Sequence, residues 1–217
     1  MVRAKYFSRV VPKIFFMPVD EDLSRCFHCA SRDNPLVHQR GVLKTATIDI
    51  MKVVLGHGAS GNAASMKPYV DGFKRRGIDA IAVDLPRGGA EKAVPVFIKT
   101  SGRGHDVIGG GQSFGGRVAS MAAVEADFGG LVLFSYPLHR PGFTDQLRIE
   151  HLPSIRCPTL FLSGDRDPFA RLDLLKQYVK LVPRSQLEIF KGQGHGLLKV
   201  LDQALDVAAE FILKNCK

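Results

Sequence analysis

Apolar positions follow two different spacings along the chain from about residue 50 onward. Short runs rich in Val, Ile and Leu, which are typical of buried strands, alternate with longer stretches in which apolar residues recur at helical spacing. The runs are MKVVLG, DAIAVDL, HDVIGGG, GLVLFSY, PTLFLSG and QLEIFKG. Strands that alternate with helices form βαβ units, so the pattern predicts an α/β protein with a mostly parallel central sheet flanked by helices.

Helices are predicted between and after these runs. They span Ala63–Arg76, Gly89–Thr100, Phe114–Ala126, Ala170–Leu181 and Leu197–Leu213. The last of them carries apolar residues at helical spacing, which predicts that one of its faces packs on the sheet. These apolar residues are Leu201, Leu205, Ala208, Ala209 and Ile212.

The first fifty residues are less regular than the rest of the chain. The stretches VVPKIFFMPV and VLKTATIDI have the composition of edge strands, but the sequence between them is irregular. No linker or internal repeat separates residues 1–50 from the remainder, and 217 residues suit one domain. We therefore expect a single domain over residues 1–217, with residues 1–50 as the N-terminal edge of the sheet.

The net charge of +9 and the pI near 9.6 raise the question of an acidic partner. The Lys and Arg residues are spread along the chain, and there is no recognisable nucleic-acid-binding motif, so we interpret them as a solvated basic surface and expect no nucleic-acid partner. No apolar run approaches the roughly 18 residues of a membrane-spanning helix, so no membrane partner is expected. Residues 1–19 are basic without an acid but too apolar and too poor in Ser for a transit peptide, which favours the cytoplasm.

The cysteines do not predict a metal site. They are Cys26, Cys29, Cys157 and Cys216. Only the first pair has metal-like spacing, and a structural zinc needs four ligands, for which His28 and His38 are the only nearby candidates. We therefore expect no metal and reduced thiols.

The stretch KVVLGHGASGN fits two incompatible chemistries. Gly56, Gly58 and Gly61 match G-x-G-x-x-G, and Asp84 ends the next apolar run about where a ribose-binding carboxylate would lie, as in dinucleotide-binding proteins. The same letters contain His57-Gly58, which in hydrolases opens the loop whose backbone N–H helps to bind an oxyanion.

A second glycine-rich stretch predicts a nucleophile. Gly111-Gln112-Ser113-Phe114-Gly115 matches G-x-S-x-G between a predicted strand and a predicted helix, the context of a nucleophile elbow. The strained turn of such an elbow needs small neighbours, which the glycines supply. Ser113 would then lie at the N-terminus of a helix, where free N–H groups favour an anion.

A serine nucleophile needs a base and an acid, and the sequence offers both downstream. Asp167 follows the strand PTLFLSG, and His195 lies in a glycine-rich loop after QLEIFKG. The order Ser, Asp, His is that of α/β hydrolases, with each residue at the C-terminal end of its own strand. Asp165, two residues earlier in the same turn, is the alternative acid.

The combination of these residues resembles the α/β-hydrolase superfamily over roughly residues 50–215. Within it, GQSFGGRVAS and YPLHRPG are similar to the small hydrolase-like family that includes testis-expressed protein 30, and the size is similar to that of dienelactone-hydrolase-like carboxylesterases. The resemblance implies an eight-stranded, mostly parallel sheet and ester or thioester hydrolysis without a cofactor. It also favours the hydrolase interpretation over dinucleotide binding, which leaves Ser113, Asp167 and His195 unexplained.

The predicted site follows from this interpretation. Ser113 attacks an acyl carbon, His195 accepts its proton, Asp167 supports the imidazolium, and the N–H groups of Ala59 and Phe114 bind the oxyanion.

Two further histidines are assigned near the substrate of this predicted site. His57 orients the oxyanion loop beside the substrate, and His139, in the insert after the fourth strand, either contacts the substrate or lies at the surface.

The insert Pro137–Cys157 is too short for a large cap, so we expect an open site for a small-molecule ester. Arg140 and Arg148 in this insert either favour an acidic substrate or are simply solvated. The alternatives to a small carboxylesterase are a catalytically silent hydrolase-fold interaction module and a small serine peptidase.

Overall fold

The computed structural model describes residues 51–216, so the edge strands expected within residues 1–50 lie outside the described part of the chain. The described residues form a sheet of six parallel strands in the order β2-β1-β3-β4-β5-β6. The strands are β1 (Lys52–Gly56), β2 (Asp79–Val83), β3 (Val107–Gln112), β4 (Gly130–Phe134), β5 (Thr159–Gly164) and β6 (Ser185–Phe190). Each of them lies within an apolar run that predicted a strand, or extends beyond it by one residue, which confirms the α/β fold with a mostly parallel sheet.

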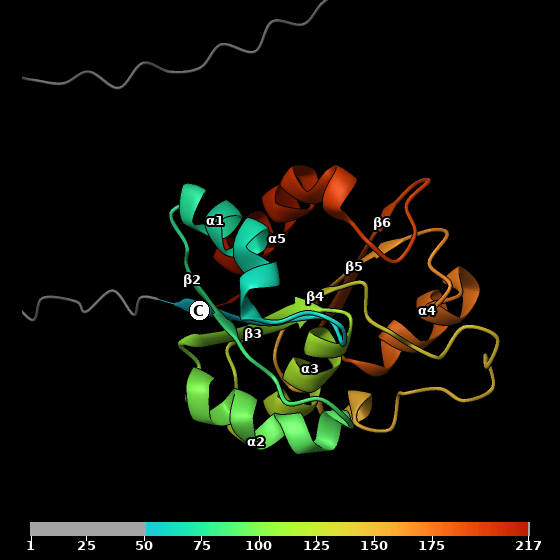
Figure 1. Ribbon diagram of the computed structural model, residues 1–217, viewed down its shortest axis with the longest axis horizontal. Helices are drawn as coiled ribbons and strands as arrows, with labels where there is room; N and C mark the ends of the chain where they lie inside the picture. Colours follow the sequence, from blue (N-terminus) through green and yellow to red (C-terminus); the bar gives the residue numbers. More distant parts are fainter. Residues whose placement is uncertain (1–50, 217) are drawn as a thin grey trace, which may run out of the picture. The chain divides into compact units, whose positions relative to one another are not determined.

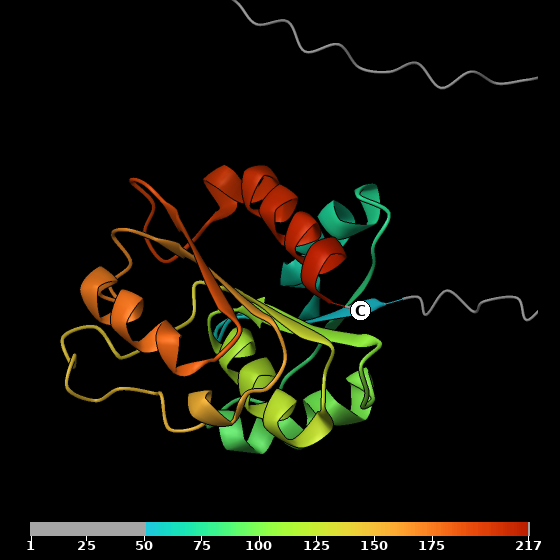
Figure 2. The same cartoon turned by 180° about the vertical axis from the view of Figure 1, so that it is seen from behind.

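Helices cover both faces of this sheet (Figures 1 and 2). The α-helices are α1 (Lys67–Arg75), α2 (Ala90–Ser101), α3 (Phe114–Ala126), α4 (Leu172–Tyr178) and α5 (Leu201–Asn215). Helices α1 and α5 lie together on one face, and α2 and α3 lie together on the other. Separate apolar clusters therefore fill the two sides, with Phe73 and Leu205 in one, and Phe97 and Phe128 in the other.

The C-terminal helix packs as its sequence pattern predicts. Leu205, Ala208, Ala209 and Ile212 are buried against the sheet, and Leu201 is partly buried at the edge of the same cluster. These positions repeat at the period of an α-helix, so they form one apolar stripe.

Three predicted helices begin or end in short 3₁₀ turns instead of continuing as one α-helix. The turns are η1 (Ala63–Met66), η3 (Val179–Leu181) and η4 (Leu198–Val200), and η2 (Leu152–Ser154) is a further one. Before α1 the cause is local, because Asn62 forms a capping box with Ser65 over η1, and Pro68 lies in the first turn of α1, where its missing N–H has no cost. Apolar spacing alone does not distinguish a 3₁₀ turn from the first turn of an α-helix.

No large cap covers the C-terminal edge of the described sheet. Between β4 and β5 the chain forms only the short turn η2 and one isolated bridge, Arg140 to Phe143. No helix within residues 51–216 is long and apolar enough to cross a membrane.

The strand order places a crossover beside the predicted nucleophile. β1 pairs with β2 on one side and with β3 on the other, so the chain reverses its direction across the sheet between β2 and β3. In open parallel sheets, ligands bind in the crevice at the C-terminal ends of the strands where this reversal occurs. The loops that follow β1 and β3 border this crevice.

Helix α3 crosses β1 at a distance that only glycines allow. A Cβ atom placed on Gly56 would lie 2.8 Å from the Cα atom of Gly115, and one placed on Gly115 would overlap the backbone of Gly56. Gly111, at the end of β3, has a φ of +152° and also lies against Gly56. Glycine at these positions therefore allows a helix to start directly after a strand and still pack on the sheet.

We predict that Gly115→Ala lowers the free energy of unfolding by about 2 kcal/mol or more, because the new methyl group meets backbone atoms that cannot rotate away. The matched control is Gly196→Ala, where an added Cβ meets nothing within 4 Å, and which is expected to change stability by less than about 1 kcal/mol. Urea unfolding followed by circular dichroism measures both. Equal stability of the two variants would contradict the close-packing argument.

Candidate active site

Ser113 occupies a strained turn between β3 and α3. Its φ of 53° and ψ of −114° are rare for a residue with a side chain, and such a conformation typically costs about 1–3 kcal/mol. The turn is held from both sides, because the Ser113 N–H donates to the carbonyl of Phe134 at 2.9 Å and its carbonyl accepts from Arg117 at 3.1 Å. The surrounding fold thus fixes the Ser113 hydroxyl at the C-terminal edge of the sheet.

His195 lies against this hydroxyl. The distance from His195 Nε2 to Ser113 Oγ is 2.7 Å, and His195 Nδ1 is 2.9 Å from both carboxylate oxygens of Asp167. A carboxylate only accepts, so Nδ1 carries the proton and Nε2 accepts the hydrogen bond from the serine hydroxyl. The side chain of Asp167 is 0% exposed and that of His195 is 22% exposed, so the pair is shielded while the ring edge reaches the surface.

Asp165 has a different role from Asp167. Its Oδ1 accepts the N–H of Gly192 at 2.7 Å, which ties the turn after β5 to the loop after β6. Asp167 Oδ1 accepts the N–H of Phe169 at 2.8 Å in addition to its contact with His195. Of the two candidate acids, Asp167 is the one that contacts the histidine.

Phe169 is a part of the site that the sequence did not indicate. Its ring lies on the imidazole of His195, with 4.2 Å between ring centroids and 34° between the planes. This contact restricts the histidine ring from the side that the carboxylate does not reach. The only sequence signal is an aromatic residue two positions after the acid, which is too common to identify a role.

The cavity beside Ser113 has a volume of about 380 Å³. Ala59, from the loop after β1, and Phe114, the first residue of α3, both line it together with the serine. The first N–H groups of an α-helix have no acceptor within the helix, so the N–H of Phe114 is available to an anion at this point. The arrangement thus places a serine hydroxyl, hydrogen-bonded to a histidine, beside backbone N–H groups at one small cavity.

The substrate contacts predicted for His57 and His139 find no support in this geometry. Both rings are buried. His57 Nδ1 donates to the carbonyl of Gly58 at 2.7 Å, and its Nε2 accepts the N–H of Leu85 at 2.9 Å. His139 is engaged in the same way, by the carbonyl of Arg140 and the N–H of Arg171. Because both nitrogens of each ring are bound to the backbone, these histidines hold loops in place.

Asp84, the carboxylate that suggested dinucleotide binding, also has a structural contact. Its Oδ1 accepts the N–H of Ala63 at 2.6 Å, so it anchors the start of η1 to the end of β2. Of the glycines in the same motif, Gly56 ends β1, whereas Gly58 and Gly61 belong to the loop that follows, which lines the cavity beside Ser113 at Ala59.

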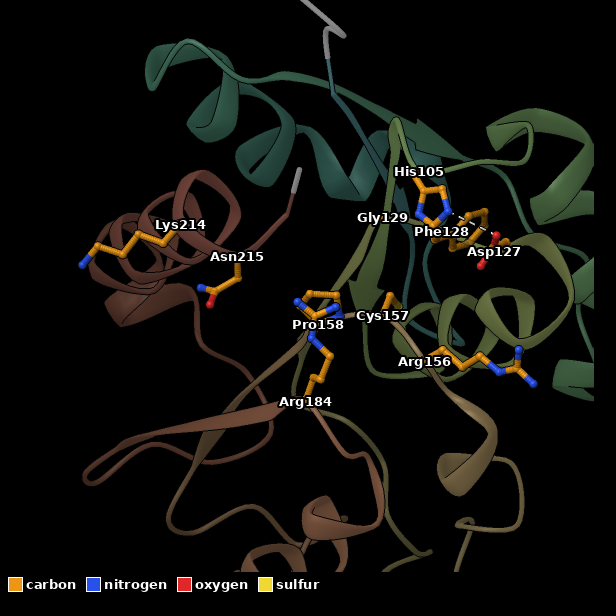
Figure 3. Close-up of a pocket in the computed structure, with 10 residues that line it drawn as sticks. All are labelled: His105, Asp127, Phe128, Gly129, Arg156, Cys157, Pro158, Arg184, Lys214 and Asn215. Carbon is orange, nitrogen blue, oxygen red and sulfur yellow. Dashed lines mark ion pairs between the residues drawn. The ribbon is translucent and has the colours of Figure 1, made fainter.

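A second cavity, of about 400 Å³, lies at the opposite edge of the sheet (Figure 3). Gly129, Pro158 and Arg184 line it, and each immediately precedes a strand. Figure 3 shows the charged ends of Arg156 and Lys214 pointing away from its centre.

The wall of this second cavity contains the thiol of Cys157. Burial raises the pKa of Cys157 to about 11, so this thiol stays protonated. In the described part of the chain, no three His, Cys, Asp or Glu side chains form a possible metal site. Cys26 and Cys29 lie outside the described residues. The first cavity, beside Ser113, is therefore the candidate active site.

A parallel sheet with a nucleophile elbow at its crossover, and with an acid and a histidine after later strands, defines the class of α/β hydrolases. A sequence profile of the family described as alpha/beta hydrolase domain matches residues 90–211, more than half of the chain, and the chain therefore belongs to this family. The closer resemblance to the testis-expressed protein 30 family stays a prediction.

Solved structures of hydrolases share the fold. A predicted CIB-like hydrolase from Thermoplasma acidophilum is 19% identical, with a TM-score of 0.61 over 76% of this chain and 87% of that chain. A malate-bound thermophilic esterase from Thermogutta terrifontis is 16% identical, with a TM-score of 0.63 over 77% and 91% of the two chains. An esterase from Pyrococcus furiosus is 15% identical, with a TM-score of 0.64 over 77% and 82%.

One titratable group near the site has a strongly shifted pKa. His151 Nε2 lies 2.8 Å from the hydroxyl of Ser120, which itself donates to the carbonyl of Arg117 at 2.8 Å, so the neutral His151 ring is the hydrogen-bond donor. Burial, followed by the positive charge of Arg117, lowers the pKa of His151 to about 4.

We predict that this shift makes stability depend on pH. The unfolded histidine binds a proton near pH 6.5, whereas the folded one does so only near pH 4, so the contribution of His151 is present above pH 6.5 and is lost as the pH falls toward 4. His151→Gln keeps a donor for Ser120 and is expected to reduce the slope of unfolding free energy against pH in this window. An NMR titration in which the His151 ring protonates near pH 6.5 would contradict the prediction.

Proposed function

We propose that the protein is a serine hydrolase that cleaves small or short-chain carboxylic esters or thioesters. The observation that carries the proposal is the continuous hydrogen-bond chain from the Ser113 hydroxyl through His195 to the buried carboxylate of Asp167. A serine hydroxyl is a weak nucleophile unless a base removes its proton, and that base needs a group that holds its tautomer. Membership of the α/β-hydrolase family supports the same class of reaction.

The acylation step uses each of these groups once. Ser113 Oγ attacks the acyl carbon while its proton passes to His195 Nε2, and Asp167 stabilises the imidazolium that forms. The carbonyl oxygen becomes an oxyanion, which the N–H groups of Phe114 and Ala59 bind. The tetrahedral intermediate then expels the alcohol or thiol, which takes the proton from His195, and the acyl group remains on Ser113.

Deacylation repeats the steps with water as the nucleophile. His195 Nε2 accepts a proton from the water that attacks the acyl carbon, and it returns this proton to Ser113 Oγ as the acid leaves. The side chain of His195 is partly exposed, which allows water to approach the acyl group. None of these steps requires a cofactor.

The shape of the cavity supports a small substrate. Its volume of about 380 Å³ lies near the lower end of typical ligand pockets. The segment between β4 and β5 forms no helical cap that would cover a long acyl chain. Pro137 and Phe169 give the cavity apolar wall area for a short chain.

We predict that the purified full chain hydrolyses 4-nitrophenyl butyrate and that Ser113→Ala lowers kcat by about 10⁴-fold or more, because no other group forms the acyl intermediate. Nitrophenol release at 400 nm measures both rates. Equal and near-background rates for the two proteins would favour a catalytically silent interaction module. A preference for the matched anilide over the ester would favour a peptidase.

We predict that substitutions of the two neighbouring aspartates have very different effects on kcat in the same assay. Asp167→Asn is expected to lower kcat by about 10³–10⁴-fold, because the amide no longer holds the Nδ1–H tautomer of His195. Asp165→Asn is the matched control, since it changes the same atoms two residues away and keeps an oxygen for the N–H of Gly192. If Asp165→Asn were the more damaging substitution, the acid assignment would be wrong.

A further inference from the structure

Three arginines surround the cavity that contains Ser113. Arg117 comes from α3, one helical turn after the serine, while Arg140 and Arg148 come from the segment between β4 and β5. Arg140 and Arg148 lie in the insert that the sequence predicted, but no sequence pattern predicted that they share a cavity with Arg117. Three guanidinium groups in the wall of one small cavity form a concentrated positive charge.

Among residues 51–216, a carboxylate compensates only one of these charges. Arg117 Nη2 is 3.0 Å from Glu91 Oε1, and its side chain is 20% exposed. Its Nε is buried and finds no hydrogen-bond acceptor among the described residues. Arg117 therefore retains an unused donor although it is ion-paired.

Arg140 and Arg148 form no ion pair with a carboxylate of residues 51–216. The polar contact of the Arg148 side chain is a long one, 3.4 Å from Nη1 to the carbonyl of Pro137. Burial, followed by the charges of Arg117 and Arg140, lowers the pKa of Arg148. Because the three arginines line the same small cavity, their like charges repel one another, and an anion between them would reduce this repulsion.

Backbone N–H groups at the N-termini of two helices add to the positive electrostatic potential of this cavity. Gly88, Gly89 and Ala90 line the cavity, and Gly89 is the N-cap of the twelve-residue helix α2. The N-terminus of α3 opens beside Ser113. Two helices therefore direct the positive ends of their dipoles at a space that the arginines already make positive.

We propose that the substrate carries a carboxylate in its acyl portion or its alcohol portion, and that Arg117, Arg140 and Arg148 bind this group while Ser113 attacks the ester or thioester carbonyl. The inference rests on the proposed function, whose substrate class it narrows. A carboxylate is small enough for this cavity and accepts two parallel N–H bonds from one guanidinium. Pro137 and Phe169 leave apolar wall for a short carbon chain between the two ends of the molecule.

The test compares two esters that differ in one charge. The first is the 4-nitrophenyl monoester of adipic acid, which has a free carboxylate. The second is the mixed diester in which this carboxylate is methylated, so the chain is the same but the charge is absent. The wild-type protein is expected to hydrolyse the charged ester with a kcat/KM about tenfold to a hundredfold higher, the range of a charge-assisted hydrogen bond. This preference is expected to shrink as NaCl is raised, because salt screens the attraction.

Substitutions test whether the arginines cause this preference for the charged ester. Arg140→Gln and Arg148→Gln are each expected to lower the ratio of the two kcat/KM values about fivefold or more. The matched control is Arg184→Gln, which removes the same charge at the opposite edge of the sheet and is expected to leave the ratio unchanged. A wild-type ratio near one, or a ratio that Arg140→Gln and Arg148→Gln do not change, would overturn the inference.

A binding measurement keeps this result separate from the proposed function. If the wild type hydrolyses neither of these esters nor 4-nitrophenyl butyrate, the proposed function fails, and calorimetric titration with adipate then decides the inference. Binding that weakens in Arg148→Gln but not in Arg184→Gln would support it. Absence of binding, or equal binding by all three proteins, would overturn it.

Discussion

The contact on which the site depends is the one between two backbones, where α3 meets β1. Gly56 and Gly115 touch without side chains, and this lets α3 begin immediately after β3. Because the helix starts so early, Ser113 is forced into its positive φ and its hydroxyl is held at the edge of the sheet. The fold offsets the cost of the strained residue through the packing of α3, whose buried face is almost entirely Gly, Ala and Val.

The remaining groups reach the serine because parallel strands end at one edge. Asp167 and His195 follow β5 and β6, and the contact between Asp165 and Gly192 fixes the two loops to each other. The histidine is then held on several sides, by the carboxylate, by the ring of Phe169 and by the serine hydroxyl. Such preorganisation is what general-base catalysis requires, since the ring need not move before it accepts the proton. In the proposed reaction, the three arginines of the cavity wall add a preference for a charged substrate to the arrangement of Ser113, His195 and Asp167.

The sequence predicted the parts of this structure that follow from local patterns. Strand positions came from apolar runs, α3 came with its bounds, and Ser113, Asp167 and His195 were selected by motif and chain order. What it did not predict depends on distant contacts. Phe169 meets His195, and Arg117 shares a cavity with Arg140 and Arg148, only because the fold brings distant segments together, so no local pattern marks either arrangement. His57 was assigned near the substrate because it lies in the predicted oxyanion loop, and His139 because it lies in the insert after the fourth strand, whereas the folded chain satisfies both rings with backbone groups. The 3₁₀ turns before α1 and α5 were missed because apolar spacing does not report hydrogen-bond register.

The account is tested most directly by locating the nucleophile chemically. The full chain is treated with a fluorophosphonate, digested with trypsin and examined by mass spectrometry. The tryptic peptide of residues 104–117 contains Ser113 as its only hydroxyl-bearing residue, so an adduct there identifies the site without further fragmentation. The account predicts one adduct per chain on this peptide and none after acid denaturation, because reactivity depends on the folded contact with His195. No adduct on the native protein, or an adduct on another peptide alone, would contradict it.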